Sequence, residues 1–237
     1  MERISVCMAT YNGEKYIKEQ IQSILSQLSK DDELIISDDN STDNTVRLIN
    51  EISDSRIKLF FNEEKGYTSN FENALKQVNG EVVFLSDQDD IWENNKVDVC
   101  LKELKNFDLV VSDCKIIDGS NKVISESYFD IRKVKKTRIG NLIKFSYLGC
   151  CLVFRSVILK KALPFPSNRL FCTHDNWLFL VGAFLFKYKI LNDKLIMYRR
   201  HNGNVSTGGM VSLTSVEFKI RYRIYLVRFL IERLLKK

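Results

Sequence analysis

The stretch EVVFLSDQDD at residues 81–90 decides the fold, because an apolar run passes directly into three carboxylates within four residues. The consecutive apolar residues 82–85 are typical of a strand that is buried on both faces of a sheet. Aspartate is disfavoured in strands and favoured in turns, so the strand is expected to end before Asp87. The same passage from apolar to polar residues occurs after ISVCMA at residues 4–9 and within ELIISD at residues 33–38. The pattern predicts a sheet whose strands end in polar loops.

Strand-like runs alternate with amphipathic segments through the first half of the chain. The predicted strands span residues 4–9, 33–38, 57–61 and 81–86, and the predicted helices span 17–28, 45–52 and 71–78. This order indicates an α/β fold with a mainly parallel central sheet flanked by helices. The second half is less regular, with predicted strands at 109–113, 148–154 and 195–198 and a predicted helix at 176–187.

Polar clusters follow three of these strands, at Thr10–Gly13, Asp38–Ser41 and Asp87–Asp90. Because ligands bind at the carboxyl ends of parallel strands, the clusters are expected to meet at one edge of the sheet. Each cluster alone is explained equally well as a solvated loop, whereas three at separate strand ends favour a binding site. Crowded carboxylates beside a buried sheet are unfavourable without a cation. Oxygen ligands suit Mg²⁺ or Mn²⁺, which bridge to substrate phosphates, so the sequence predicts a diphosphate ligand.

The segments VCMATYN (6–12), ELIISDDNSTD (33–43) and SDQDD (86–90) resemble, as a set, the pattern of the family 2 glycosyltransferases. The resemblance spans about residues 1–210 and implies the GT-A fold. Residues 1–90 would form the nucleotide-binding half and residues 91–210 the acceptor half. Residues 211–237 would then be a tail outside the catalytic domain.

The resemblance also implies roles for individual residues of the nucleotide-binding half. Asp39 is similar to the carboxylate that accepts a hydrogen bond from the N3–H of a uracil or thymine ring. Thr10, Tyr11 and Asn12 would line the nucleotide pocket, and Asp87 would support the site from the ribose side.

Metal and diphosphate contacts are implied at two places. Asp89 resembles the metal-binding aspartate of the family's D-x-D motif. His201 lies in the glycine-containing loop YRRHNGN, where the resemblance implies that a histidine completes the metal shell and that Arg199 or Arg200 pairs with diphosphate. A lone histidine is more often structural than a ligand, so both alternatives stay open for His201.

On the acceptor side, Asp175 in the segment THDNW matches the aspartate that serves as catalytic base in the family. The usual residue before this base is glutamate, whereas this chain has His174. Position alone favours a second interpretation, in which Asp175 only caps the following helix. Trp177 and Gly149 are also expected near the acceptor.

The predicted reaction is a metal-dependent transfer with inversion from a UDP- or dTDP-sugar, in which Asp175 removes the proton of the acceptor hydroxyl. The segments DQDDIW, HDNW and YRRHNGNVS resemble a subgroup of rhamnosyltransferases, which implies dTDP-rhamnose, although UDP-hexose is an alternative. The implied acceptor is a lipid-linked saccharide of a bacterial surface polysaccharide. A nucleotidyltransferase is disfavoured because no glycine-rich phosphate loop follows the first strand, and a catalytically silent module is disfavoured by the intact aspartates.

Charge and cysteine usage bear on partners and compartment. Residues 211–237 hold seven Lys/Arg and two Asp/Glu, which leaves 29 basic against 28 acidic residues in the first 210. A nearly neutral domain lacks the broad positive surface of a nucleic-acid binder. Six cysteines without metal-ligand spacing are expected to be buried free thiols in a reducing compartment. The start of the chain is too polar for a secretion signal, and the longest apolar run, ten residues at 177–186, is too short to cross a bilayer, so a cytosolic protein is expected.

The tail has two apolar stripes at helical spacing. Ile220, Ile224, Val227, Ile231 and Leu234 form an aliphatic stripe, and Phe218, Tyr222, Tyr225 and Phe229 form an aromatic stripe on the opposite side. One interpretation packs one stripe on the domain and leaves the other exposed or against a partner chain. The other, which the basic residues favour, attaches the helix peripherally to the anionic inner face of the plasma membrane.

Overall fold

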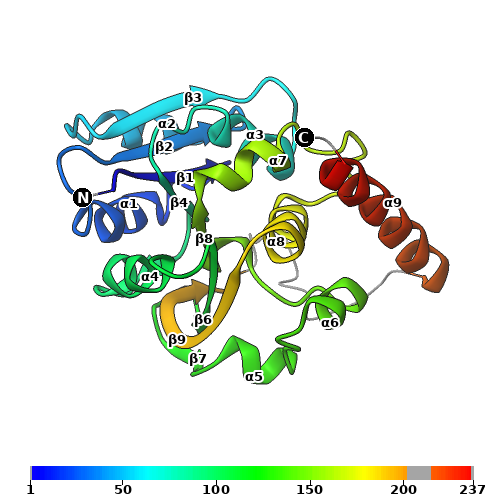
Figure 1. Ribbon diagram of the computed structural model, residues 1–237. Coiled ribbons are helices and arrows are strands. Elements are labelled where there is room, and N and C mark those ends of the chain that lie inside the picture. Colours follow the sequence, from blue (N-terminus) through cyan, green and yellow to red (C-terminus); the bar gives the residue numbers. More distant parts are fainter. Residues whose placement is uncertain (1, 202–214, 236–237) are drawn as a thin grey trace.

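The computed structural model describes residues 2–201 and 215–235 as a mixed α/β structure (Figure 1). The first half contains β1 (Ile4–Thr10), α1 (Ile17–Leu25), β2 (Glu33–Asp38), α2 (Thr45–Asn50), β3 (Ile57–Phe61), α3 (Tyr67–Leu75), β4 (Val82–Ser86), β5 (Ile91–Trp92) and α4 (Lys96–Leu104). The second half contains β6 (Leu109–Ile117), β7 (Val123–Ser125), α5 (Tyr128–Arg132), α6 (Arg138–Ile143), η1 (Gly149–Cys151), β8 (Leu152–Arg155), η2 (Ser156–Ile158), α7 (Leu159–Ala162), α8 (His174–Leu185), β9 (Tyr188–Arg199) and α9 (Val216–Leu235).

One sheet runs through both halves, in the order β3-β2-β1-β4-β8-β6-β9-β5, with β7 beside β6. Strands β3, β2, β1 and β4 are mutually parallel, as the alternating pattern predicted. Strand β8 is antiparallel to both β4 and β6, so the sheet becomes mixed where the second half begins. Helices α1 and α2 contact each other on one face of the sheet, and α3 lies on the other face, where it also contacts α8 (Figure 1).

The strands predicted in the first half agree with the structure to within one residue, whereas the three strands predicted in the second half differ. Strand β6 extends four residues beyond the predicted strand 109–113. Residues Gly149–Cys151 form a 3₁₀ turn rather than the start of the predicted strand 148–154. Strand β9 begins seven residues before the predicted strand 195–198. The prediction missed its first part because Asn192 and Asp193 are typical of turns. Such a pair is tolerated because β6 and β9 pair with irregular register there.

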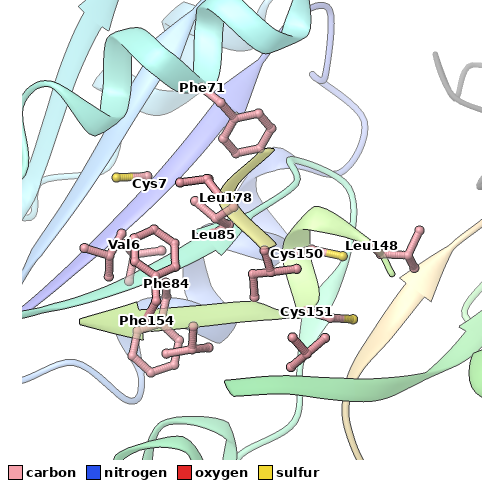
Figure 2. Packing of buried hydrophobic residues seen from close by; sticks show 14 of the residues in the cluster. Val6, Cys7, Phe71, Phe84, Leu85, Leu148, Cys150, Cys151, Phe154 and Leu178 are labelled. Carbon is pink, nitrogen blue, oxygen red and sulfur yellow. The ribbon is translucent and has the colours of Figure 1, made fainter. Parts of the chain in front are cut away.

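The core lies between the sheet and the helices on its two faces. Figure 2 shows Phe84 of β4 and Phe154 of β8 packed together, with Phe71 of α3 and Leu178 of α8 nearby. All six cysteines are buried and free, as predicted. The apolar run 177–186 lies within or next to α8, which explains its length without a membrane.

Helix α9 presents its two stripes to different surroundings, and the aromatic stripe packs on the domain. The ring of Phe171 lies 5.4 Å from that of Phe218 and 5.6 Å from that of Tyr225, whose hydroxyl accepts a hydrogen bond from the Asn168 N–H. In the aliphatic stripe, Val227 is half-buried, whereas four residues are exposed: Ile220, Ile224, Ile231 and Leu234. Among the described residues, no helix combines the length and apolar content needed to cross a bilayer.

Candidate active site

Three strand ends meet at one edge of the sheet. Thr10 is paired in register with Asp38, Met8 with Ser86, and the Asp39 N–H donates to the Thr10 carbonyl over 2.9 Å. A cavity of about 520 Å³ opens at this edge. It brings together eight of the predicted site residues: Thr10, Tyr11, Asp39, Asp87, Asp89, Gly149, His174 and Asp175.

Asp39 is held at the cavity by two donors that the sequence did not single out. The Asn62 side chain donates to Oδ1 over 2.8 Å, and the Gly66 N–H donates to Oδ2 over 2.9 Å. Gly66 has φ 118, a conformation that favours glycine, at the start of α3. Each carboxylate oxygen keeps a second lone pair, so Asp39 can still accept a hydrogen bond from a ligand.

Asp38 and Asn12 hold the loops in place. Asp38 is buried and accepts hydrogen bonds from the hydroxyls of Thr10 and Ser41 over 2.7 and 2.6 Å. Asn12, with φ 48, receives the Thr42 N–H on its side-chain oxygen over 2.8 Å. Asn12 was expected at the nucleotide, but the structure does not place it among the residues that line the cavity. Left-handed asparagine is common in turns, and here it joins the first two polar loops.

Gln88 joins the first strand end to the fourth. Its side-chain oxygen accepts from the Tyr11 N–H over 2.8 Å, and its side-chain nitrogen donates to the Tyr11 carbonyl over 2.9 Å. This reciprocal pair fixes Tyr11, whose exposed side chain lines the cavity.

The acidic cluster after β4 has the electrostatics of a cation site. Burial, followed by the negative charges of Asp89 and Asp175, raises the pKa of Asp87 to about 7. Burial and the charges of Asp89 and Asp87 raise the pKa of Asp90 well above its usual range. The Cys150 thiol hydrogen-bonds to both Asp87 and Asp90, which opposes these shifts.

The donor set of this cluster fits a hard divalent cation. Single ligand atoms of Asp87, Asp90 and Cys150 lie within 4.8 Å of one another, and Asp90 Oδ2 is buried with no hydrogen-bond partner among the described residues. Carboxylate oxygens suit Mg²⁺ and Mn²⁺, whereas a thiol does not, so the carboxylates are the relevant ligands.

His201 and Asp89 place two further potential metal ligands next to each other. His201 Nε2 lies 2.8 Å from Asp89 Oδ2, and its ring is 4.9 Å from the ring of Tyr16. His201 is therefore in direct contact with the D-x-D segment, whereas residues 202–204 of the YRRHNGN segment lie outside the described residues.

Arg199 does not reach the cavity, which differs from its expected contact with diphosphate. It is fully buried, and its guanidinium donates to the Asp89 carbonyl over 2.6 Å and to Glu19 over 2.8 Å. It also stacks on Tyr16, 4.4 Å from the ring centre. Arg199 therefore holds the D-x-D segment against the first helix. Its neighbour Arg200 donates to the Tyr198 hydroxyl over 3.2 Å, and Tyr198 lines the cavity.

Asp175 lies in the first turn of α8 and lines the cavity. Its Oδ1 accepts from the Asn176 N–H over 2.7 Å, but it is not the N-cap residue of α8, which is Thr173. A role limited to capping therefore does not account for its position at the cavity. Asp175 and Asp87 line the same cavity, and the charge of Asp175 contributes to the raised pKa of Asp87.

His174 is a buried, neutral wall of the cavity. Its ring stacks on Phe71 with 3.9 Å between centroids, and burial lowers its pKa. Neither ring nitrogen has a hydrogen-bond partner among the described residues. A Cβ on Gly149 would lie 2.6 Å from His174 Nε2 and 3.4 Å from Asp175 Cβ, so the glycine permits this close packing.

Trp177 does not line the cavity, although it was expected near the acceptor. It is fully buried, and its indole N–H donates to the Ala162 carbonyl over 2.9 Å. Trp177 lies on a buried part of α8, so its side chain points into the core. The cavity is instead lined by aromatic residues, of which only Tyr198, in the YRRHNGN segment, belongs to a motif: Tyr67, Phe71, Tyr128, Phe145, Tyr147 and Tyr198.

A parallel β3-β2-β1-β4 region with acidic strand ends, joined to a mixed region that supplies Asp175, defines the GT-A glycosyltransferase class. The chain belongs to glycosyl transferase family 2, whose family model matches residues 5–163.

Several bacterial relatives share this family. The dTDP-rhamnosyl transferase RfbG of Shigella flexneri is 31% identical, over 93% of this chain and 79% of its own length. The Escherichia coli protein WfgD, a UDP-Glc:alpha-D-GlcNAc-diphosphoundecaprenol beta-1,3-glucosyltransferase, is 32% identical over 69% of this chain, which covers only 64% of WfgD. An uncharacterized glycosyltransferase of Nostoc, 29% identical over 85% of this chain, is likewise covered over only 66% of its length.

Solved structures support the fold. Residues 1–349 of S. aureus TarS in complex with UDP-GlcNAc match 99% of this chain with a TM-score of 0.73 at 21% identity, and the chain covers 67% of that structure. A Pyrobaculum calidifontis mannosyltransferase in complex with GDP-Man and Mn²⁺ matches 98% of the chain with a TM-score of 0.60 at 18% identity, and 74% of that structure is covered.

Proposed function

We propose that the protein transfers a sugar from a UDP- or dTDP-sugar to a hydroxyl of a saccharide acceptor, with inversion at the anomeric carbon. The observation that carries this proposal is the gathering of Asp39, the acidic cluster Asp87–Asp90 and Asp175 around one cavity. Asp39 binds the base of the nucleotide, and the acidic cluster neutralises the pyrophosphate through a cation. Asp175 faces the part of the cavity that is left for the acceptor.

Selection of a uracil or thymine ring rests on Asp39. Its two oxygens are oriented by Asn62 and Gly66, so the carboxylate is held before the ligand arrives. An imide N–H donates to such an acceptor, whereas cytosine presents an acceptor nitrogen at the same position. The Shigella flexneri relative is named for a dTDP sugar and the Escherichia coli relative for UDP-glucose, which is consistent with either ring.

A divalent cation, Mn²⁺ or Mg²⁺, would be held by Asp89 with His201, and by the neighbouring carboxylates Asp87 and Asp90. When bound, it supplies positive charge that stabilises the departing nucleoside diphosphate. Arg200, which donates to the hydroxyl of the cavity residue Tyr198, is the proposed diphosphate contact, whereas the buried Arg199 positions the acidic segment.

Asp175 acts as the general base. Its carboxylate faces the cavity from the first turn of α8, and it removes the proton of the attacking hydroxyl while the new glycosidic bond forms. A single displacement of this kind inverts the configuration and needs no enzyme nucleophile. The aromatic wall of the acceptor side offers flat apolar faces on which sugar rings stack.

The acceptor is a lipid-linked saccharide, and the protein binds peripherally to the inner face of the plasma membrane. The exposed aliphatic stripe of α9 supports this, because apolar side chains flanked by basic residues suit an anionic bilayer. The Escherichia coli relative is named for a diphosphoundecaprenol acceptor.

A thermal-shift screen of UDP, dTDP, GDP and CDP, each with and without Mn²⁺, tests the donor assignment. UDP or dTDP with Mn²⁺ is expected to raise Tm more than GDP or CDP does. Equal shifts with all four nucleotides, or no dependence on Mn²⁺, would contradict it. Release of pyrophosphate from a nucleoside triphosphate and a sugar phosphate would indicate a nucleotidyltransferase, and binding without turnover on any saccharide would indicate a silent module.

A further inference from the structure

A second basic surface lies outside the tail, in the segment IRKVKKTRIGNLIK at residues 131–144, which we call the basic arm. It runs from the end of α5 through α6 and holds six Lys/Arg and no Asp/Glu. The net charge of the first 210 residues does not reveal this segment, because acidic residues elsewhere offset its positive charge. Four of its lysines, Lys133, Lys135, Lys136 and Lys144, are exposed.

The basic arm also exposes apolar side chains. Ile139 and Ile143 of α6 are 67% and 58% exposed, and Ile131 is 48% exposed. Ile139 and Ile143 are not part of the hydrophobic core. Exposed isoleucines among lysines are typical of a segment that enters the interface between lipid headgroups and acyl chains.

The fold holds the arm in this shape by specific polar contacts. The Thr137 hydroxyl caps α6 by accepting from the Gly140 N–H over 3.1 Å. The buried Asn141 donates to the Lys135 carbonyl over 2.5 Å and to the Tyr147 hydroxyl over 3.0 Å. The exposure of the isoleucines is therefore a property of an ordered element.

The arm lies between α9 and the cavity. Arg223 of α9 donates to the Leu142 carbonyl over 3.0 Å, and both α6 and α9 pack against α8. Figure 1 shows the two helices beyond α8, on the side of the molecule away from strands β1–β3. On its other side, the arm continues into Phe145 and Tyr147, which line the cavity.

We infer that the basic arm is a second membrane-binding element, which docks on anionic phospholipid beside α9 and turns the acceptor side of the cavity toward the bilayer. The consequence for the acceptor rests on the proposed function, whereas lipid binding by the arm does not. A second copy of the chain does not fit, because two such surfaces repel each other. Nucleic acid does not fit either, because isoleucines stand where base-stacking aromatic residues are needed.

Co-sedimentation of the full chain with vesicles tests the inference, using phosphatidylglycerol–phosphatidylcholine vesicles and pure phosphatidylcholine vesicles. Lys135→Glu/Lys144→Glu removes charge from the arm, and Ile139→Ser/Ile143→Ser removes its exposed apolar groups. Lys30→Glu/Lys105→Glu is the matched control, since both lysines are exposed and lie in the first half of the chain.

The charge variant is expected to lower partitioning onto anionic vesicles by at least roughly 25-fold, at about fivefold for each of the two basic groups lost. Partitioning of the isoleucine variant is expected to be lower than that of the wild type at both low and high salt, because salt screens charges but not apolar contacts. The control variant is expected to bind like the wild type. Equal partitioning of wild type and both arm variants would overturn the inference, as would binding to polyglutamate without binding to vesicles. UDP binding by each variant, measured without vesicles, is expected to be unchanged, so a failure of the arm is distinguished from a failure of the donor site.

Discussion

Replacing Asp39 by asparagine tests how the site selects a base. In the protein, the Asn62 side chain and the Gly66 N–H each donate to a different oxygen of Asp39. Asparagine offers only one oxygen, so its amide nitrogen faces one of these donors whichever way the amide is turned. The variant thus loses the charge of the acceptor and the orientation of the group.

The size of the effect follows from the bond that is lost. A hydrogen bond to a charged group contributes about 1.5–3 kcal/mol, which corresponds to roughly a 10- to 150-fold loss of UDP affinity. CDP has no imide N–H to donate, so its affinity is expected to change by less than about threefold. Discrimination between the two nucleotides is therefore expected to collapse.

Isothermal titration of UDP and CDP in the presence of Mn²⁺ measures both affinities. Asp43→Asn is the matched control: Asp43 accepts the Glu14 and Thr45 N–H groups over 3.1 and 2.9 Å but does not line the cavity. An Asp39→Asn variant that keeps wild-type discrimination between UDP and CDP would refute the reasoning. Equal losses for both nucleotides would show that the substitution acts through the fold of the loop.

Three further predictions concern the other side of the cavity and the acidic cluster. Asp175→Asn is expected to lower kcat by at least about 10²-fold while UDP affinity stays within about twofold, and retained turnover would exclude this residue as the base. Gly149→Ala places a Cβ against His174 and Asp175, so kcat is expected to fall by about tenfold or more with an unchanged KM for the donor, whereas wild-type kcat would show that the ring moves freely. Because the pKa of Asp87 is raised from 3.8 to about 7, the native protein binds more protons than the unfolded chain between these values, and the Tm of the metal-free protein is expected to fall as pH rises through that window. Mn²⁺ or Asp87→Asn is expected to reduce that fall, and an identical pH profile in the variant would contradict it.

The first half of the fold was predictable because its signals are local. A run such as residues 82–85 is buried on both faces, and the aspartates that follow it mark the strand end in the sequence itself. The parallel order then brings separate strand ends to one edge, so Asp39 and Asp89 were expected together before any contact was known. Asp175 was found through a motif that is also local.

Features that depend on distant contacts were not predictable. Arg199 is buried by Glu19 and by the carbonyl of Asp89, which lie far apart in the chain, so nothing near position 199 distinguishes a structural arginine from a diphosphate ligand. Trp177 was expected near the acceptor because it lies two residues after Asp175, whereas its side chain is buried in the core. The aromatic wall has no motif of its own, since its members come from α3, α5, the segment after α6 and β9, and only Tyr198 lies in a segment that the sequence analysis singled out.

Anomalous scattering from a crystal soaked with Mn²⁺ and UDP tests the central claim most directly. The account predicts one manganese peak within ligand distance of the Asp89 carboxylate and of the diphosphate, with the uracil ring at Asp39 and an open path from the sugar-bearing end to Asp175. A manganese peak away from the Asp87–Asp90 segment, or a uracil ring bound remote from Asp39, would contradict it.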